Sequence, residues 1–208
     1  MEITVIPRQR AFSSTWSGGT TTEFFISPHQ SSYQKRDFDI RISSATVDLN
    51  ESEFTVLSGY DRIITPLTNQ LYLSFQETAD TYHLQPLDLA FFDGAHHTHC
   101  VGRATDFNVM VRKGLKATAD VLTTSTYLKP AAHSFIYVPS LQPSPLRGSY
   151  LEHERLQGDT LYHFTRQSSP AYLHLEESGL RILYVTGYAY RCKVESIQCR
   201  AYAYSMSQ

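Results

Sequence analysis

Charged side chains are scarce in this sequence. Its 208 residues include 18 Lys and Arg and 20 Asp and Glu, so 18% are charged and the formal net charge is -2. A typical soluble domain has roughly 25% charged residues. Phosphate contacts by clustered Lys and Arg supply most of the affinity of proteins for nucleic acids, and the sequence has no such cluster. We therefore expect no nucleic-acid partner.

Long apolar runs and paired cysteines are also missing. No run approaches the roughly 20 residues needed to span a bilayer. The first residues, MEITVIPRQRAF, lack the basic-then-apolar order of a signal peptide. We therefore expect no membrane partner and a cytoplasmic location. The three cysteines, Cys100, Cys192 and Cys199, are odd in number and form no CxxC pair, so reduced, buried thiols are expected rather than a disulfide framework or a zinc ribbon.

Aromatic and β-branched residues in alternating patterns are abundant. The chain has 14 Tyr, 11 Phe and one Trp, and its hydrophobic fraction of 41% is enough to form a core. Period-two alternation, typical of half-buried strands, recurs throughout, whereas helical spacing does not. Strands are predicted over residues 38–47, 54–57, 70–75, 89–92, 107–111, 135–138, 161–164, 171–175, 180–185 and 189–192. About ten short strands with Gly, Pro, Asn, Asp and Ser between them predict an all-β sandwich or barrel of antiparallel sheet.

Two stretches lack strong alternation. Residues 113–125 are predicted to be a connector, and residues 139–148, which contain three prolines, a surface loop. Each half of the chain has strands around a turn, Asp93-Gly94 in the first and Gly158-Asp159 in the second. The length and this similarity predict two β-units in one compact body.

Two of the predicted strands combine an apolar face with a polar one, because alternate residues of a strand share a face. In the first, Ile40 and Ile42 take one face, and the other carries Arg41, Ser43, Ala45 and Val47. In the second, the apolar face carries Phe107, Val109 and Val111, and the polar face carries Asp106, Asn108, Met110 and Arg112. These guanidinium-bearing faces are the strongest indication of a binding site.

The polar faces have two interpretations. Antiparallel sheets commonly face water on one side, so the polar residues could simply be solvated. Alternatively, they line the interior of a barrel, which can hold one small ligand. Arg41 and Arg112 would then bind the carboxylates of an anionic ligand through paired charge-assisted hydrogen bonds. Ser43 and Asn108 would orient that ligand.

A second unusual segment, residues 16–23, reads Trp-Ser-Gly-Gly-Thr-Thr-Thr-Glu. Its glycines permit a tight turn or a close backbone approach, and its threonines can bond locally or to a ligand. The segment is either a Gly-Gly turn into a Thr-rich strand with Trp16 in the core, or the rim of a ligand site formed by Trp16, Thr20 and Thr21. The glycine motifs of phosphate-binding loops are absent from the sequence.

Together these segments resemble the HutD/Ves family of bacterial cupin-like proteins. The matching pieces over residues 16–112 are, in order, Trp16-Ser17-Gly18-Gly19 with Thr21 and Glu23, Arg41-Ile42-Ser43-Ser44-Ala45 with Val47, Phe54 through Gly59 to Asp61-Arg62, Phe92 with Gly94, and Asp106-Phe107-Asn108-Val109-Met110 with Arg112. The second half matches more loosely, through Gly158-Asp159 and the strand pattern. The chain differs from many members at Ile40 and Thr22, where they carry an aromatic residue and an arginine.

The resemblance implies a bicupin, in which two jelly-roll barrels pack together. Residues 1–114 would form the first barrel with the ligand site, and residues 115–208 the second. For the HutD branch it implies a part in the control of histidine utilisation, by binding N-formylglutamate or a related small carboxylate metabolite, without a cofactor or catalysis. The ligand-binding residues then expected are Trp16, Thr20, Thr21, Glu23, Arg41, Ser43, Arg62, Asn108 and Arg112.

A group of histidines, His96, His97 and His99, suggests a metal site, because imidazole binds Zn, Fe and Ni. In metal cupins a Glu closely follows such an alternating pair, but here no Glu occurs before Asp106. A solvated, His-rich loop is the preferred interpretation, and adventitious Zn or Ni binding is the alternative. We therefore expect no metal.

Enzymatic alternatives rest on fewer residues. The GxSxG motif is absent, and no cysteine has a recognisable catalytic context. A metal-dependent cupin oxygenase would use His97 and His99, an isomerase-like cupin would use Glu23 as base, and a protein-interaction module would use no ligand site. The dipeptide Asp61-Arg62 is interpreted as an ion pair that holds a turn, with ligand contact by Arg62 as the alternative.

The end of the chain is rich in tyrosine, at positions 188, 190, 202 and 204. Residues 188–204 are predicted to form a closing pair of strands whose rings pack on the body. The alternative is that this stretch forms the surface of a homodimer.

Overall fold

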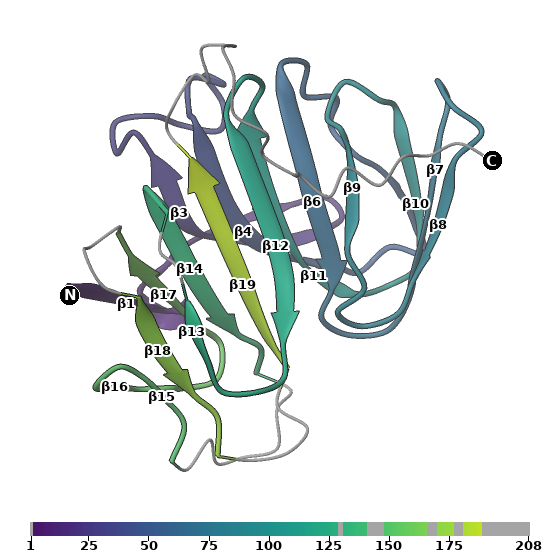
Figure 1. Ribbon diagram of the computed structural model, residues 1–208. Helices are drawn as coiled ribbons and strands as arrows, with labels where there is room; N and C mark the ends of the chain where they lie inside the picture. Colours follow the sequence, from purple (N-terminus) through teal and green to yellow (C-terminus); the bar gives the residue numbers. More distant parts are fainter. Residues whose placement is uncertain (1, 129–130, 141–147, 166–169, 177–180, 189–208) are drawn as a thin grey trace, which may run out of the picture.

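The computed structural model describes residues 2–128, 131–140, 148–165, 170–176 and 181–188, which are built almost wholly of antiparallel strands (Figure 1). Within these ranges the only helical element is the short 3-10 turn η1 (Arg8–Arg10). No helix of the described part is long and apolar enough to cross a membrane. The strands form four sheets in two packed jelly-roll barrels, which confirms the predicted all-β bicupin fold.

The first barrel consists of a six-stranded sheet that packs against a four-stranded one. The six-stranded sheet has the order β2 (Phe12–Trp16), β3 (Gly19–Ser27), β4 (Ile40–Val47), β11 (Thr105–Arg112), β6 (Tyr60–Pro66) and β9 (Ala90–Asp93). The four-stranded sheet has the order β5 (Glu51–Glu53), β10 (Thr98–Val101), β7 (Leu71–Phe75) and β8 (Thr81–Leu84).

The second barrel has the same plan. Its five-stranded sheet has the order β1 (Ile3–Pro7), β17 (Thr160–Phe164), β14 (His133–Val138), β19 (Ile182–Tyr188) and β12 (Lys116–Leu122). Its four-stranded sheet has the order β13 (Thr126–Leu128), β18 (Ala171–His174), β15 (Tyr150–Leu151) and β16 (Glu154–Arg155). Because β1 pairs with β17, the beginning of the chain completes a sheet of this barrel. The division into residues 1–114 and 115–208 stays a prediction.

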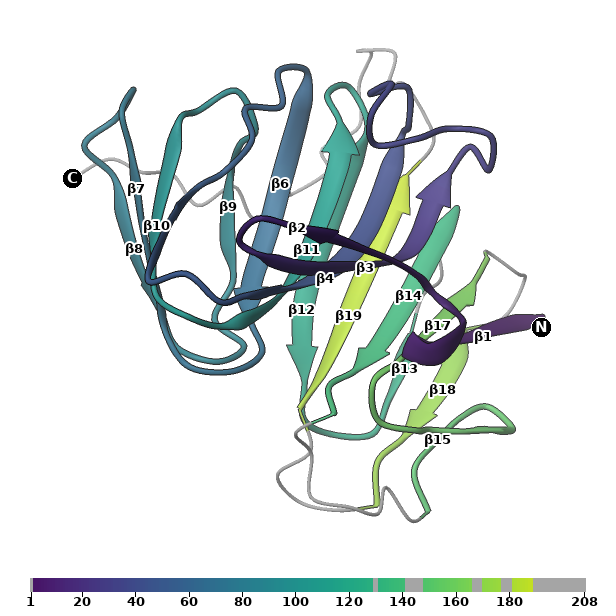
Figure 2. The same cartoon turned by 180° about the vertical axis from the view of Figure 1, so that it is seen from behind.

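A shared apolar core joins the two large sheets, which appear as adjacent layers in both views (Figures 1 and 2). The first barrel contributes Ile40, Ile42, Phe107, Val109 and Val111, the apolar faces predicted for the two strands. The second contributes Phe135, Tyr137, Leu183 and Val185. Each fully buried side chain of this size contributes roughly 1.5–3 kcal/mol, so this core is a major source of stability.

Two of the predicted elements are wrong. Residues 113–125 are not a simple connector, because they contain β12, which pairs along its whole length with β19. In β12 the side chains packed on the shared core are Ala117, Ala119 and Val121, and alanine is a weak strand former that gives little apolar signal. The strand predicted over residues 54–57 is not present. The strand next to this segment is β5, which ends at Glu53.

Several expectations fall on parts of the chain that the structure does not describe. The strand predicted over 189–192, Cys192 and Cys199 lie outside the described residues. The tyrosine-rich stretch at 188–204 lies outside them as well, apart from Tyr188 at the end of β19. Of the cysteines, only Cys100 is placed, and it is a buried free thiol whose pKa burial raises to about 12.

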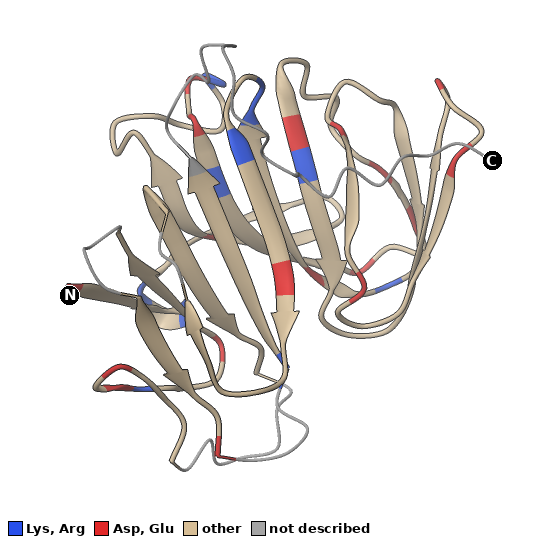
Figure 3. Cartoon of the chain, in the orientation of Figure 1, with Lys and Arg blue, Asp and Glu red and all other residues tan. Residues whose placement is uncertain are grey.

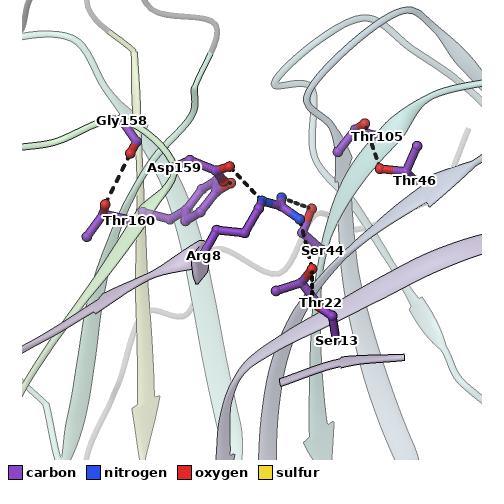
Figure 4. Close-up of polar contacts among 10 residues, drawn as sticks. Arg8, Ser13, Thr22, Ser44, Thr46, Thr105, Gly158, Asp159 and Thr160 are labelled. Carbon is purple, nitrogen blue, oxygen red and sulfur yellow. Dashed lines mark hydrogen bonds and ion pairs between the residues drawn. The ribbon is translucent and has the colours of Figure 1, made fainter. Parts of the chain in front are cut away.

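One arginine, Arg8, links the two barrels (Figure 4). Its Nε lies 2.6 Å from Oδ2 of Asp159, which precedes β17 in the second barrel. Its Nη1 and Nη2 donate to the hydroxyls of Thr22 (2.9 Å) and Ser44 (3.0 Å) on β3 and β4 of the first barrel. Tyr137 donates to the other oxygen of Asp159 at 2.7 Å. The contacts hold the sheets together beside the apolar core.

We predict that Asp159→Asn weakens this link and lowers stability by roughly 1–2 kcal/mol, because a partly buried charge-assisted hydrogen bond is lost. Asparagine tolerates the positive φ of 56° at this position and can still accept from Tyr137, so the change affects mainly the contact with Arg8. Urea denaturation checks the prediction. Asp48→Asn, in an exposed loop, is the matched control and should leave the midpoint unchanged. Equal midpoints for all three proteins would contradict it.

Candidate functional site

The polar side chains of β4, β11 and β6 lie in three successive rows, together with apolar neighbours, on the face that looks into the first barrel. The rows follow from the register of the three strands, in which alternate residues share a face. They are Arg41, Met110 and Arg62, then Ser43, Asn108 and Ile64, then Ala45, Asp106 and Pro66. Glu23 on β3 extends the second row beside Ser43, and Phe92 on β9 extends the first beside Arg62.

These polar side chains are buried. Arg41 and Arg62 are each 6% exposed, Asp106 is 4% exposed and Asn108 is 6% exposed. The interpretation of the polar faces as solvated is therefore wrong for Arg41, Ser43 and Asn108, which are buried. Most of the strand residues are uncharged (Figure 3), which makes a buried cluster of charges the more unusual.

The guanidinium of Arg41 is fixed by its neighbours. Its Nε lies 2.6 Å from Oε2 of Glu23, and its Nη1 donates to the hydroxyl of Ser43 at 3.1 Å. The ring of Tyr33 lies 4.5 Å from the guanidinium carbon, a cation–π distance. Glu23 and Ser43, both predicted to contact the ligand, thus hold Arg41 in place.

Arg62 is different, because within the described residues its guanidinium makes no hydrogen bond or ion pair, and its buried Nε has no partner. It lies instead 4.6 Å from the ring of Phe54 and 5.3 Å from that of Phe92. Burial lowers the pKa of Arg62 to about 10, which leaves it charged at neutral pH. The interpretation of Asp61-Arg62 as an ion pair is wrong, because the two residues are successive in β6 and point to opposite faces, Asp61 being exposed.

The third row contains Asp106, an acid that was not among the ligand residues expected from the sequence. Burial raises the pKa of Asp106 to about 7, although the positive charges of Arg62 and Arg41 act in the opposite direction. Its Oδ1 is buried and has no partner within the described residues, and the same holds for Oδ1 of Asn108. Asp106 shares a face with Asn108, and this alternation was the signal that could have identified it.

The interior of the second barrel has a different character. Its core consists of apolar side chains, among them Ile136, Val138, Leu151, Phe164 and Leu173. The hydroxyl of Tyr162 is hydrogen-bonded to the backbone of Gln157 and Arg155. Within the described residues, the interiors of the two barrels therefore differ in polarity.

Of the other predicted ligand residues, the structure brings only Thr21 to this face, where it extends the third row beside Ala45. Arg112 lies at the end of β11, 39% exposed, with its Nε 2.9 Å from Asp39. Trp16 is exposed and its ring lies over Gly18. On β3, Thr20 is exposed and points away from the face that carries Thr21 and Glu23. Their contact with a ligand stays a prediction.

The histidine group lies at the edge of the first barrel. His97 is exposed and its Nδ1 lies 2.5 Å from Glu77, and Nδ1 of His99, on β10, lies 2.7 Å from Glu53. His96 is half-buried against the ring of Phe75. Among the residues that the structure describes, no three His, Cys, Asp or Glu side chains are grouped so that they could hold a metal ion.

Comparisons with known proteins agree with this architecture. The model of the family described as HutD matches residues 8–177. No curated protein matches the chain. Among solved structures, HutD from Pseudomonas fluorescens is similar with a TM-score of 0.73 and 17% identity, over 90% of this chain and 98% of that one.

Two further structures share the fold. A conserved protein of unknown function from Pseudomonas aeruginosa has a TM-score of 0.74 and 18% identity, over 91% of this chain and 100% of that one. A bacterial pirin from Escherichia coli, solved in complex with nickel(II), has a TM-score of 0.60 and 7% identity, over 88% of this chain and 98% of that one. At these identities the likeness shows the fold alone.

We predict that Asp106 makes the unliganded protein lose stability as pH rises. An unfolded Asp titrates near 3.9, so between that pH and about 7 the folded state holds a proton that the unfolded state has released. From about pH 5 to about pH 8 this costs the wild type roughly 2–3 kcal/mol more than Asp106→Asn, which has no such proton. Urea denaturation at the two pH values measures the difference, and parallel losses in the two proteins would disprove the assignment.

Proposed function

The chain belongs to the HutD family of cupin-fold proteins, and we propose that it binds a small carboxylate-bearing metabolite in its first barrel. The observation that carries the proposal is Arg62, a buried cation with no hydrogen-bonding partner within the described residues. Taking a charge out of water costs several kcal/mol unless a partner compensates. A carboxylate is the natural partner, because its two oxygens match the guanidinium fork.

The position of Arg41 supports the same proposal. It lies in the same row as Arg62, with Met110 between them on β11. Glu23 binds Nε of Arg41, and Nη1 is bonded to Ser43, so the guanidinium is preorganised. Preorganisation lowers the entropy cost of binding. In this proposal, Arg62 anchors the carboxylate and Arg41 supplies a second, oriented cation.

The proposed role is that of a binding protein, not an enzyme. An N-formylglutamate-like acid is the ligand that membership of the family suggests, and its binding would sense or buffer an intermediate of histidine utilisation in the cytoplasm. Glu23 supports a binding role, because it is engaged with Arg41 at 2.6 Å and so holds a ligand-binding group in place.

We predict that N-formyl-L-glutamate raises the melting temperature of the wild type and that Arg62→Met abolishes the shift. A ligand at a hundredfold its dissociation constant stabilises the native state by about 2.7 kcal/mol. For a chain of this size that corresponds to roughly 5–10 °C. Thermal-shift measurements with formate, L-glutamate, urocanate and N-formyl-L-glutamate make the test.

Arg62→Met is a favourable variant, because it removes an unpaired buried charge and keeps an unbranched apolar side chain, so the variant should fold. Arg103→Met, at an exposed position in a loop, is the matched control and should retain the ligand response. The proposal fails if none of the acids shifts the melting temperature, or if Arg62→Met responds as the wild type does.

A further inference from the structure

On the face of the six-stranded sheet that looks into the first barrel, three buried polar atoms have no partner among the described residues: Nε of Arg62, Oδ1 of Asn108 and Oδ1 of Asp106. Each belongs to a side chain that is more than nine-tenths buried. Buried polar groups in folded proteins are nearly always hydrogen-bonded, since an unsatisfied one loses its hydration without compensation. Three such atoms on one face of one sheet indicate missing partners of a defined kind.

The three atoms differ in what they require. Nε of Arg62 carries a hydrogen and can only donate, so its partner is an acceptor, which the proposed carboxylate supplies. A side-chain carbonyl oxygen, such as Oδ1 of Asn108, can only accept, so its partner is a donor. Asp106, with a pKa of about 7, accepts when it is ionised and can also donate when it is protonated. The proposed carboxylate satisfies the first atom and leaves Oδ1 of Asn108 without a donor.

The register of the strands places these groups close together. Asn108 is paired with Ile64, and Arg62 is two residues away from Ile64 on the same face, so Asn108 and Arg62 are diagonal neighbours. Diagonal neighbours in a sheet lie roughly 7–8 Å apart, within reach of polar side chains that point at one small molecule. Asp106 occupies the next row, beyond Asn108. A ligand that satisfies both Arg62 and Asn108 needs its donor within a few bonds of its carboxylate.

We propose that the first-barrel site selects acids that carry an uncharged hydrogen-bond donor, an N–H or O–H, close to the carboxylate, and that Asn108 and Asp106 recognise this donor. The inference rests on the proposed acid site and adds a requirement to it. Asn108 and Asp106 act as specificity-determining residues, because a site with unpaired buried acceptors rejects an analogue that lacks the donor.

The charges around the site favour a neutral donor over an ammonium group. Arg41 is compensated by Glu23, whereas Arg62 has no ion-pair partner within the described residues. Asp106 stands near both arginines, and burial raises its pKa to about 7, so it offsets their charge only partly at neutral pH. The excess positive charge repels an ammonium and leaves amide and hydroxyl donors as the better fit.

Matched ligand pairs test the proposal by isothermal titration calorimetry on the full chain. The first pair is 2-hydroxyglutarate and glutarate, which differ by one hydroxyl. The second is N-formyl-L-glutamate and its ester analogue, in which oxygen replaces the amide N–H. In each pair the donor-bearing acid should bind at least about tenfold more tightly, because the analogue leaves a buried acceptor unpaired. L-Glutamate, whose donor is a cation, should bind more weakly than 2-hydroxyglutarate.

Substitution of Asn108 tests whether this residue discriminates between the two acids of each pair. Asn108→Leu replaces the buried amide by an apolar side chain of similar size, and the affinity ratio within each pair should fall to near unity. The ratio is the measurement, since loss of the amide also changes the affinity of both ligands. Asn50→Leu, at an exposed position outside the sheets, is the matched control and should retain the wild-type ratio.

The outcomes separate this inference from the function on which it rests. If none of the acids binds, the acid site itself is disproved. If the two members of each pair bind the wild type equally, or if L-glutamate binds more tightly than 2-hydroxyglutarate, the acid site stands and the neutral-donor requirement is overturned. A wild-type ratio in Asn108→Leu would likewise overturn the role of Asn108.

Discussion

In the six-stranded sheet, β4, β11 and β6 are covered on both faces, and this double burial constrains everything around them. One face packs against the second barrel through Ile40, Ile42 and the apolar residues of β11. The other face closes the first barrel and carries Arg41, Arg62, Asp106 and Asn108. A solvated sheet face accepts polar residues at no cost, whereas a covered one requires that each find a partner. The polar side chains on this covered face therefore need hydrogen-bonding partners inside the barrel.

The second barrel has the same architecture, but its described core is apolar. Within the described residues, the buried hydroxyl of Tyr162 in that core is satisfied by the backbone. The shared core and Arg8, with its ion pair to Asp159, join this barrel to the first. The apolar second barrel thus packs against a neighbour whose interior is less favourable. Natural proteins commonly retain such unfavourable groups at functional sites and compensate for them elsewhere.

The sequence allowed prediction of features that repeat locally. Alternation in residues 38–47 and 106–112 indicated the apolar and polar faces, and both were confirmed, because a period of two identifies a strand face without knowledge of its partner. Contacts between distant segments could not be predicted in this way. The pairing of β1 with β17 and the contact of Arg8 with Asp159, 151 residues further along the chain, join segments that are far apart in the sequence. The strand β12 was missed because alanines carry little apolar signal.

The prediction of the site residues also succeeded where it used local alternation and failed where it needed other contacts. Arg41, Ser43 and Asn108 were placed together correctly because they share the faces of adjacent strands. The interpretation of Asp61-Arg62 as an ion pair neglected the fact that neighbours in a strand point to opposite sides. Arg112 and Asn108 lie on the same face of β11 because they are an even number of residues apart, but β11 ends at Arg112, beside Asp39. Alternation identifies the face on which a side chain lies, whereas its depth in the barrel depends on where the strand ends.

The surroundings of Arg62 support the proposal that a carboxylate completes the site. The rings of Phe54 and Phe92 lie within cation–π distance of its guanidinium, and such contacts contribute roughly 0.5–2 kcal/mol each. Removal of a cation from water costs several kcal/mol, so the rings offset only part of it. Asp106 is too strongly affected by its own burial to supply a full negative charge at neutral pH. The guanidinium of Arg62 contacts these two rings but makes no hydrogen bond within the described residues, so its planar fork remains available to a carboxylate, which binds such a fork through two parallel hydrogen bonds.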